Sequence, residues 1–451
     1  MTAAVNVPAV GPLSRNGRYL VLSAAFLGWL FSGVQMSLMN LASRSATEDF
    51  IRANQLPLIP ATGDSQSEPT LADEAAVKRT LSRESPRWFS YYNSAFLLGA
   101  ALGGLTFGWL GDRAGRVRSM GISILWYSLF AGLGYVTRSP EQLLCLRFAS
   151  AMGVGGMWPT GVALAAEAWD DVSRPMLSGL IGTAANVGIV LMGIVGYVTP
   201  ITMSSWRWIM LVAAAPVILG VFVLVFVPES PTWLAAREKR RSTGDSPRIL
   251  RDLFRPPLLK LTLLGIALGA IPLLGGWGVT AWLIPWSDQV LGAIDPKAKA
   301  FTSIMRAGGG SIGSLIGGWV ANLCGRRLTY FLISLLTVIT SEIIYFNLTP
   351  DDALFSTMVF VVGFISTVFF GWLPLYLPEM FPTHTRASGS GISFNFGRIL
   401  TAVGVLGTGA LTAWFGEDYA AAGRVTSLIY AFGMLVILFA PDTSKRNLKD
   451  V

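Results

Sequence analysis

Long apolar stretches alternate with short polar ones along most of the chain, and this pattern predicts membrane-spanning helices. Each stretch approaches the roughly 20 residues that an α-helix needs to cross a hydrocarbon core of about 30 Å. The twelve stretches lie near residues 19–42, 89–111, 118–137, 141–168, 176–199, 206–227, 258–286, 300–321, 328–348, 354–378, 388–415 and 423–440. The sequence therefore predicts an all-α membrane protein with twelve transmembrane helices.

Composition agrees with this class and excludes several functions. Of the 451 residues, 52% are hydrophobic and 13% are charged. The two cysteines and His384, the single histidine, have no metal-ligand spacing, and the chain has no G-x-x-x-x-G-K-[ST] phosphate loop. We therefore predict no metal, no cofactor and no enzymatic activity.

The positive charge is unevenly distributed between the two sides of the predicted membrane. The formal net charge is +8, and most Lys and Arg residues fall in the tails and in the loops that share a side with them. This asymmetry follows the positive-inside rule and predicts a multi-pass protein of the plasma membrane with both termini in the cytoplasm. It argues against a nucleic-acid partner. The first 20 residues lack the apolar core and cleavage site of a signal peptide, so we expect a cytoplasmic tail.

The two halves of the chain repeat the same motifs. Matching residues recur at offsets of about 210 to 213, as in a duplicated unit: Gly115 and Arg116 with Gly325 and Arg326, Glu167 with Glu379, Arg174 with Arg386, and Ser230 with Thr443. We predict a six-helix bundle over 1–230 and a second over 261–451, joined by a basic cytoplasmic linker at 231–260. The outer loop at 43–88 forms either a short amphipathic helix over the outer mouth or a disordered insertion.

The motifs resemble those of the major facilitator superfamily over nearly the whole chain. The loop signature G-x-x-x-D-R-x-G-R is met within "GWLGDRAGRVRS", at 108–119, and a degraded copy, "GGWVANLCGRRL", follows at 317–328. An arginine followed by close glycines begins at Arg147. "PESPTWLAAR" and "PEMFPTHTRASGSG" resemble segments of sugar porters and their organic-acid relatives, and "GISFNFGRIL" resembles the sialate and aromatic-acid proton symporters. The resemblance implies two bundles that alternate access to a central site.

Charged residues near the predicted inner face form the candidate gate. In lipid, paired charges at helix ends hold neighbouring helices together, and they can also serve only as headgroup anchors. Asn322 replaces the acid of the second copy, so we expect either an asymmetric gate or, if the amide still accepts a helix-capping hydrogen bond, little change. The predicted gating and coupling residues are Asp112, Arg113, Arg116, Arg147, Glu167, Arg174, Arg326, Glu379 and Arg386.

Charges inside the predicted helices point to the solute. Arg147, Arg306, Glu342 and Arg398 lie within apolar stretches, where an unpaired charge costs several kcal/mol. Arg306 and Arg398 have uncharged counterparts in the first half, so we predict that they bind an anionic solute. The other predicted binding residues are Gln35, Asn40, Tyr92, Asn93, Asn186, Trp277, Trp282, Trp372 and Asn395.

The sequence predicts a monomeric secondary transporter of a small organic anion in the lipid bilayer. A facilitator or symporter of neutral sugars and a non-transporting sensor or scaffold are the alternatives. The first helix has no acid, whereas organic-acid proton symporters carry one there. We therefore expect transport that needs no proton gradient, and we expect Ser32→Asp to introduce proton dependence. Coupling through Glu167, Glu379 or the protonated solute stays open.

Overall fold

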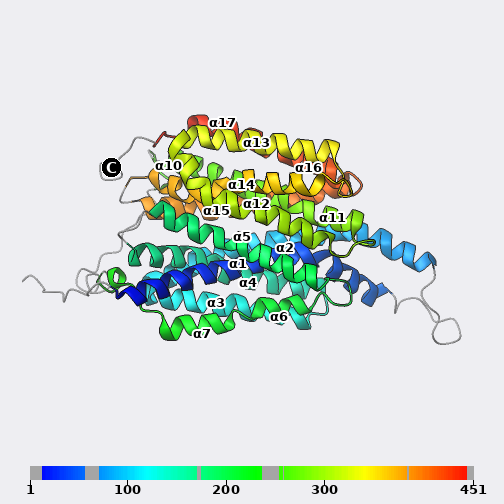
Figure 1. Ribbon diagram of the computed structural model, residues 1–451, viewed down its shortest axis with the longest axis horizontal. Helices are drawn as coiled ribbons and strands as arrows, with labels where there is room; N and C mark the ends of the chain where they lie inside the picture. Colours follow the sequence, from blue (N-terminus) through cyan, green and yellow to red (C-terminus); the bar gives the residue numbers. More distant parts are fainter. Residues whose placement is uncertain are drawn as a thin grey trace, which may run out of the picture.

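A computed structural model of the protein describes residues 13–55, 71–169, 174–235, 253–256, 258–382 and 385–443. All regular structure in these ranges is helical, and the long helices run side by side along the molecule (Figure 1). His384 lies outside the described residues. The described termini lie at the same end of the bundle, which we name the inner end because the charge pattern predicts that it faces the cytoplasm. The opposite end is the outer end.

The α-helices in the described residues of the first half are drawn from blue to green in Figure 1. They are α1 (Arg15–Gln55), α2 (Leu71–Ala114), α3 (Arg116–Leu133), α4 (Pro140–Ala168), α5 (Arg174–Val198), α6 (Trp208–Ala214) and α7 (Val217–Phe226), with a short 3₁₀ helix at Gly134–Val136. Pro216 stands between α6 and α7 and has no N–H to continue the helical hydrogen bonds. The proline therefore divides a single apolar span, Trp208–Phe226, into two short helices.

The second half repeats this arrangement. It contains α10 (Leu258–Gly278), α11 (Leu283–Leu291), α12 (Ala298–Cys324), α13 (Arg326–Asn347), α14 (Phe355–Glu379), α15 (Arg386–Trp414), α16 (Tyr419–Ser427) and α17 (Ile429–Val436), with 3₁₀ helices at Thr280–Trp282 and Ile437–Phe439. Each helix or broken pair of helices corresponds to one predicted span. The fold is the all-α, two-bundle arrangement that the sequence predicts.

The repeated loop motif has the same backbone geometry in both halves. α2 ends and α3 begins around Gly115, whose φ is +120°, and α12 and α13 meet around Gly325, whose φ is +81°. A side chain at either position would be strained, because L-residues rarely adopt such φ values. The glycine of the motif therefore makes the tight connection between consecutive antiparallel helices.

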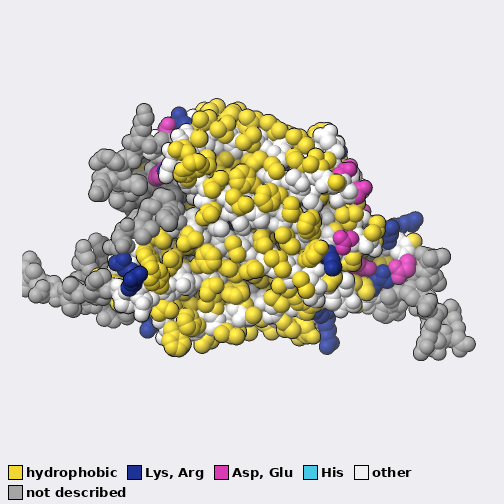
Figure 2. Space-filling view, in the orientation of Figure 1, with side chains coloured by type: hydrophobic (Ala, Val, Ile, Leu, Met, Phe, Trp, Pro, Cys, Tyr) yellow, Lys and Arg dark blue, Asp and Glu magenta, His cyan; other side chains and the backbone are white. Residues whose placement is uncertain are grey.

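Hydropathy and surface agree with a multi-pass membrane protein. In the described residues, ten helices or helix pairs are long and apolar enough to cross a membrane. The other two, α4 and α12, have 29 and 27 residues and lie among them. Apolar side chains cover the middle of the visible face, and charged side chains gather at its two ends (Figure 2). This distribution suits a hydrocarbon layer flanked by water.

Two elements differ from the sequence-based expectation. Most of the predicted loop at 43–88 is helical, because α1 continues to Gln55 and α2 already begins at Leu71. The two extensions contact each other through Arg52, whose Nη1 lies 2.7 Å from Glu74 Oε1. The predicted helix at 258–286 is broken, since the backbone of Val279 leaves the helical conformation between α10 and Thr280–Trp282.

The halves pack against each other mainly through α2 with α15 and α5 with α12. Ser94 Oγ donates to the carbonyl oxygen of Ala402 at 2.9 Å, and the hydroxyls of Thr183 and Ser314 lie 3.0 Å apart. Both contacts join the first half to the second and rest on small side chains. They bring the two bundles close enough to share a central site.

Candidate functional site

A cavity of about 160 Å³ lies between the two halves, near the middle of the helices. α1, α2, α4 and α5 line it from the first half, and α10, α12, α14 and α15 line it from the second. Five of the predicted binding residues line it: Asn40, Asn186, Trp277, Arg306 and Arg398. Both halves therefore contribute to one central site.

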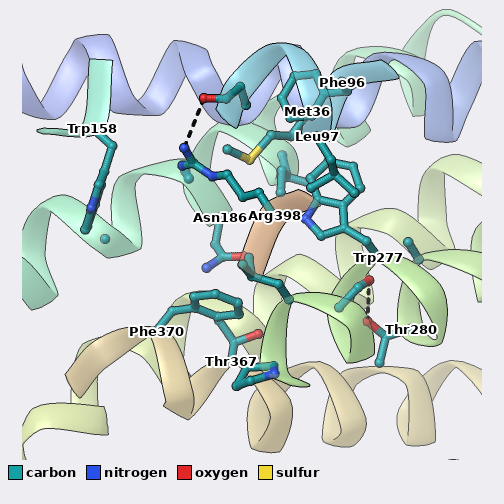
Figure 3. Close-up of a pocket in the computed structure, with 18 of the residues that line it drawn as sticks. Met36, Phe96, Leu97, Trp158, Asn186, Trp277, Thr280, Thr367, Phe370 and Arg398 are labelled. Atoms are coloured by element: carbon teal, nitrogen blue, oxygen red, sulfur yellow. Dashed lines mark hydrogen bonds between the residues drawn. The ribbon is translucent and has the colours of Figure 1, made fainter. Parts of the chain in front are cut away.

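Arg398 projects from α15 and joins the two halves (Figure 3). Its side chain is buried, and its Nη1 donates to the carbonyl oxygen of Ala100 in α2 and to Asn395 Oδ1, both at 3.2 Å. The guanidinium lies 5.0 Å from the centre of the Phe394 ring. These contacts hold the group in place and leave other N–H donors of the guanidinium available to a ligand.

Arg306 supplies the second positive charge of the cavity from α12. Its Nε is buried and has no hydrogen-bond partner among the described residues. The described residues that line the cavity include no Asp or Glu. The site therefore presents two guanidinium groups without a carboxylate to neutralise them, which is costly in a membrane unless an anion or water enters.

Aromatic rings form much of the cavity wall. Trp29 and Trp158 pack with their centroids 4.7 Å apart, and Phe96 and Trp277 pack at 5.2 Å. Figure 3 shows Trp158 and Phe370 on different sides of the space around Asn186. Sequence reasoning missed Trp29, Trp158 and Phe370, although tryptophans at the middle of a predicted span, away from its ends, are a usable signal. A planar, apolar body with an anionic group fits these walls.

The break between α10 and α11 opens the backbone next to the cavity. Thr280 and Ala281 line the site directly after the break at Val279. The carbonyl oxygen of Val279 accepts two hydrogen bonds, from Trp282 N at 3.2 Å and from Tyr345 Oη at 2.9 Å. In membrane proteins, a helix that is interrupted at a central cavity can present polar backbone groups to a solute. This is tolerated because the remaining backbone groups form hydrogen bonds with other parts of the protein.

Six predicted binding residues do not line the cavity. Five of them contact other residues, and the sixth is buried within its helix. Asn395 Oδ1 accepts the hydrogen bond from Arg398 described above. Gln35 Nε2 donates to the carbonyl oxygen of Ala213 at 2.8 Å. Tyr92 Oη donates to the carbonyl oxygen of Pro140 at 3.4 Å, and Asn93 is fully buried in α2. The ring centroids of Trp282 and Phe89 lie 5.0 Å apart, and those of Trp372 and Tyr330 lie 6.3 Å apart. Helical spacing alone could not separate these faces from the cavity face.

A network of charges and hydroxyls lies at the inner end of the first half. Arg116 Nη1 lies 2.6 Å from Asp112 Oδ1, and Arg116 Nε lies 3.7 Å from Glu167 Oε1. The hydroxyl of Ser230 donates to Glu167. The loop motif, the end of α4 and the segment after α7 are thereby joined within the first half.

The second half repeats this network with the amide in place of the acid. Arg326 Nη1 donates to Asn322 Oδ1 at 2.9 Å, and Arg326 Nη2 lies 3.2 Å from Glu379 Oε1. Thr443 Oγ1 donates to Glu379 Oε2 at 2.6 Å. Asn322 therefore keeps the hydrogen bond to the arginine of the motif without its charge, and this partner is a side chain, not the helix end that the capping alternative requires.

The other predicted gating residues occupy separate places. Arg113 lies over the Trp109 ring at 4.5 Å, on the surface. Arg147 is buried behind the cavity wall, with its guanidinium 4.2 Å from the centre of the Phe96 ring and its Nη1 2.7 Å from the carbonyl oxygen of Gln35. The side chains of Arg174 and Arg386 lie outside the described part. Glu342, the fourth charge within the helices, accepts a hydrogen bond from Ser427 away from the cavity.

Two helical bundles with an apolar exterior and, between them, a cavity that holds two arginines are typical of a membrane transport protein. Comparison with known proteins identifies the family. Residues 85–305 match the Major Facilitator Superfamily. The cis,cis-muconate transport protein of Acinetobacter baylyi is 31% identical over 68% of this chain and 74% of its own length. The chain belongs to the major facilitator superfamily, whose members are transporters and not enzymes.

Two further similarities extend over more of the chain. The sialic acid transporter of Escherichia coli is 24% identical over 75% of this chain and 80% of its own length. A D-xylose–proton symporter of known structure superposes with a TM-score of 0.67 at 17% identity, covering 95% of this chain and 99% of that one. At that identity the structural match supports the fold alone.

Proposed function

We propose that the protein is a secondary transporter of a small organic anion, which it carries across the membrane by alternating access. One observation supports this most directly: the cavity between the halves is lined by Arg306 and Arg398 and, among the described lining residues, by no carboxylate. In a low-dielectric site two such charges favour a solute that neutralises them. The relative that transports cis,cis-muconate and the one that transports sialic acid both carry organic acids.

The proposed binding site combines charge recognition with an apolar wall. Arg398 and Arg306 bind the carboxylate of the solute, Asn40 and Asn186 offer amides, and Trp277 covers the planar part. The six predicted residues outside the lining support these groups or the bundle. We place the site between a first bundle at 1–230 and a second at 261–451, in a monomer of the plasma membrane with cytoplasmic termini.

Uptake by purified protein in proteoliposomes tests this function. We expect saturable uptake of a carboxylic acid such as cis,cis-muconate, benzoate or sialic acid, and no competition by an excess of neutral sugar. Competition by D-xylose, without competition by the acids, would instead favour the sugar facilitator. A chain that binds an acid but moves none of the tested solutes would be a sensor or scaffold.

We propose that the two inner-end networks gate access from the inside. Asp112 is about half exposed in this state, and its hydrogen-bond partner Arg116 lies in its own half. The carboxylate is therefore available to the other half when the inner end closes, where it can stabilise the end of a neighbouring helix. Arg113, Arg116, Glu167 and Arg174 support this gate in the first half, as do Arg326, Glu379 and Arg386 in the second.

Asp112→Asn is expected to shift the population away from the state with a closed inner end, because the amide keeps the hydrogen bond to Arg116 but loses the charge. Spin-label distances across the inner end measure the shift. Asn322→Asp is the matched control, since it adds a charge at the equivalent position of the second half and should not reproduce the shift. An unchanged distribution in Asp112→Asn would make Asp112 a headgroup anchor.

A further inference from the structure

A buried ion pair lies at the outer end of the second half, outside the cavity described above. Lys299 at the start of α12 and Asp288 in α11 have side chains only 4% and 9% exposed, and Lys299 Nζ lies 3.3 Å from Asp288 Oδ1. Burying two such charges is costly unless each finds further partners. The helix predicted at 258–286 ends before Asp288, so the sequence pattern places this residue in an outer loop.

Two consecutive residues of α1, in the first half, supply these partners. Lys299 Nζ donates to Ser45 Oγ at 3.0 Å, and Arg44 Nε lies 3.9 Å from Asp288 Oδ2. The Ser45 hydroxyl donates its own hydrogen to the carbonyl oxygen of Ile201 at 3.2 Å, so it can only accept from Lys299. The ion pair of the second half is thereby bound to the first half at both of its ends.

The cluster separates two cavities. A recess of about 630 Å³ at the outer end is lined by Arg44, Ser45, Asp288 and Lys299, and none of its lining residues lines the central cavity. On α1, Asn40 of the central cavity stands about one helical turn below Arg44, roughly 6 Å along the axis. On α12, Arg306 stands about two turns below Lys299. The cluster is therefore part of the thin partition between the outer recess and the site.

We propose that Arg44, Ser45, Asp288 and Lys299 form an outer latch that holds the outer end of the transporter closed. When the halves separate at this end, Asp288 and Lys299 stay together on the second half but lose Arg44 and Ser45. Water then replaces those contacts. The contacts that cross between the halves thus stabilise the closed state. On the second half, these contacts are made by Asp288 and Lys299.

The nearby Arg52 does not link the two halves. Arg52 pairs with Glu48 and Glu74, which belong to α1 and α2 of the same half. Those pairs move together when the halves rock. They join the two helical extensions of the first half, whereas the latch joins one half to the other.

The test exchanges the two charges of the pair, Asp288→Lys with Lys299→Asp. This double variant keeps an ion pair within the second half but places an ammonium group opposite Arg44. Spin labels at Ser204→Cys and Ile294→Cys, two exposed positions on opposite halves beside the recess, report the opening. The background is Cys145→Ser with Cys324→Ser, because both native cysteines are exposed. Repulsion between like charges at this distance should raise the ratio of open to closed populations at least about tenfold.

Adding Arg44→Glu to the exchanged pair should restore the closed distance, because an attractive contact returns. The matched control exchanges Asp418 and Arg424, an outer pair 4.0 Å apart within α16 and its cap, and should leave the distances unchanged. If the exchanged protein does not fold, Arg44→Gln alone must still favour the open distance. Wild-type distances in the exchanged protein, or in Arg44→Gln, would overturn the latch and leave Asp288–Lys299 a structural pair of one half.

Discussion

Arg398→Ala is expected to abolish detectable binding of cis,cis-muconate or whichever acid the uptake assay identifies. The guanidinium is buried in the cavity and is held by Ala100 and Asn395, so it is already oriented before the solute arrives. Losing a charged hydrogen bond to the solute costs about 1.5 to 3 kcal/mol, or roughly 10- to 150-fold in Kd, before the loss of the cavity charge is added. Isothermal titration of the purified variant measures this.

Arg398→Lys is expected to retain part of the affinity. The ammonium keeps the positive charge but cannot contact a carboxylate, Ala100 and Asn395 with a planar fork of donors. Arg424→Ala, which removes a partly exposed arginine of the outer end, is the control and should bind as the wild type does. Wild-type affinity in a folded Arg398→Ala protein would remove Arg398 from the site and leave Arg306 as the candidate anion partner.

The fold was predictable because the hydrocarbon layer imposes a strong length rule. Twelve apolar stretches, the repeated glycine–arginine motif and the offset between halves determined the helices and the family. The repeat also extends to tertiary contacts that the sequence analysis did not anticipate. Ser230 and Thr443 donate to Glu167 and Glu379 in their respective halves.

The cavity was predictable only in part. Unpaired arginines are informative because charge in a membrane requires compensation, and Arg306 and Arg398 do line the cavity. Polar and aromatic side chains say less about which residues line the cavity. A polar group can form a hydrogen bond with a backbone carbonyl, and an aromatic ring can pack on another ring, at many places in the bundle. Gln35 donates to Ala213, and Trp282 packs on Phe89, away from the cavity. Which face of a helix meets the cavity depends on packing between the halves.

The outer ends of α1, α2 and α11 were the least predictable parts. Residues 43–55 and 71–88 contain many charges, so a hydropathy criterion ends each membrane helix too early. Several of their charges are instead paired, as Arg52 is with Glu74, and the helices continue beyond the apolar region. Asp288 was assigned to a loop for the same reason, and its burial depends on Lys299, which is 11 residues further along the chain.

Transport is expected to proceed without a proton gradient. A proton-driven carrier needs a group that changes protonation as its two faces alternate, and the described lining of the cavity offers arginines, which keep their protons, and no carboxylate. Glu167 and Glu379 are held by arginine and hydroxyl partners at the inner end. Downhill uptake or exchange of the solute should therefore persist in proteoliposomes with equal pH on both sides.

Introducing a carboxylate into the cavity is expected to create proton dependence, and the structure changes where it should be placed. Ser32, the position suggested by the sequence, is fully buried, donates to the carbonyl oxygen of Gly28 at 2.9 Å and does not line the cavity. Asn40 lies on the same helix, lines the cavity, and has a buried Oδ1 without a partner among the described residues. Asn40→Asp is nearly isosteric and adds a titratable group to the cavity.

The measurement compares solute uptake with and without an imposed pH gradient, and with a protonophore. Uptake by Asn40→Asp should increase with the pH gradient, whereas uptake by the wild type and by Ser32→Asp should not. A carboxylate at residue 32 would lie within the helix packing, outside the cavity. Accumulation by the wild type against a solute gradient, driven by pH and abolished by the protonophore, would contradict the prediction. The proton site would then lie outside the cavity lining, and neutral variants of Glu167, Glu379 and Asp288 would identify it by which of them abolishes accumulation but preserves exchange.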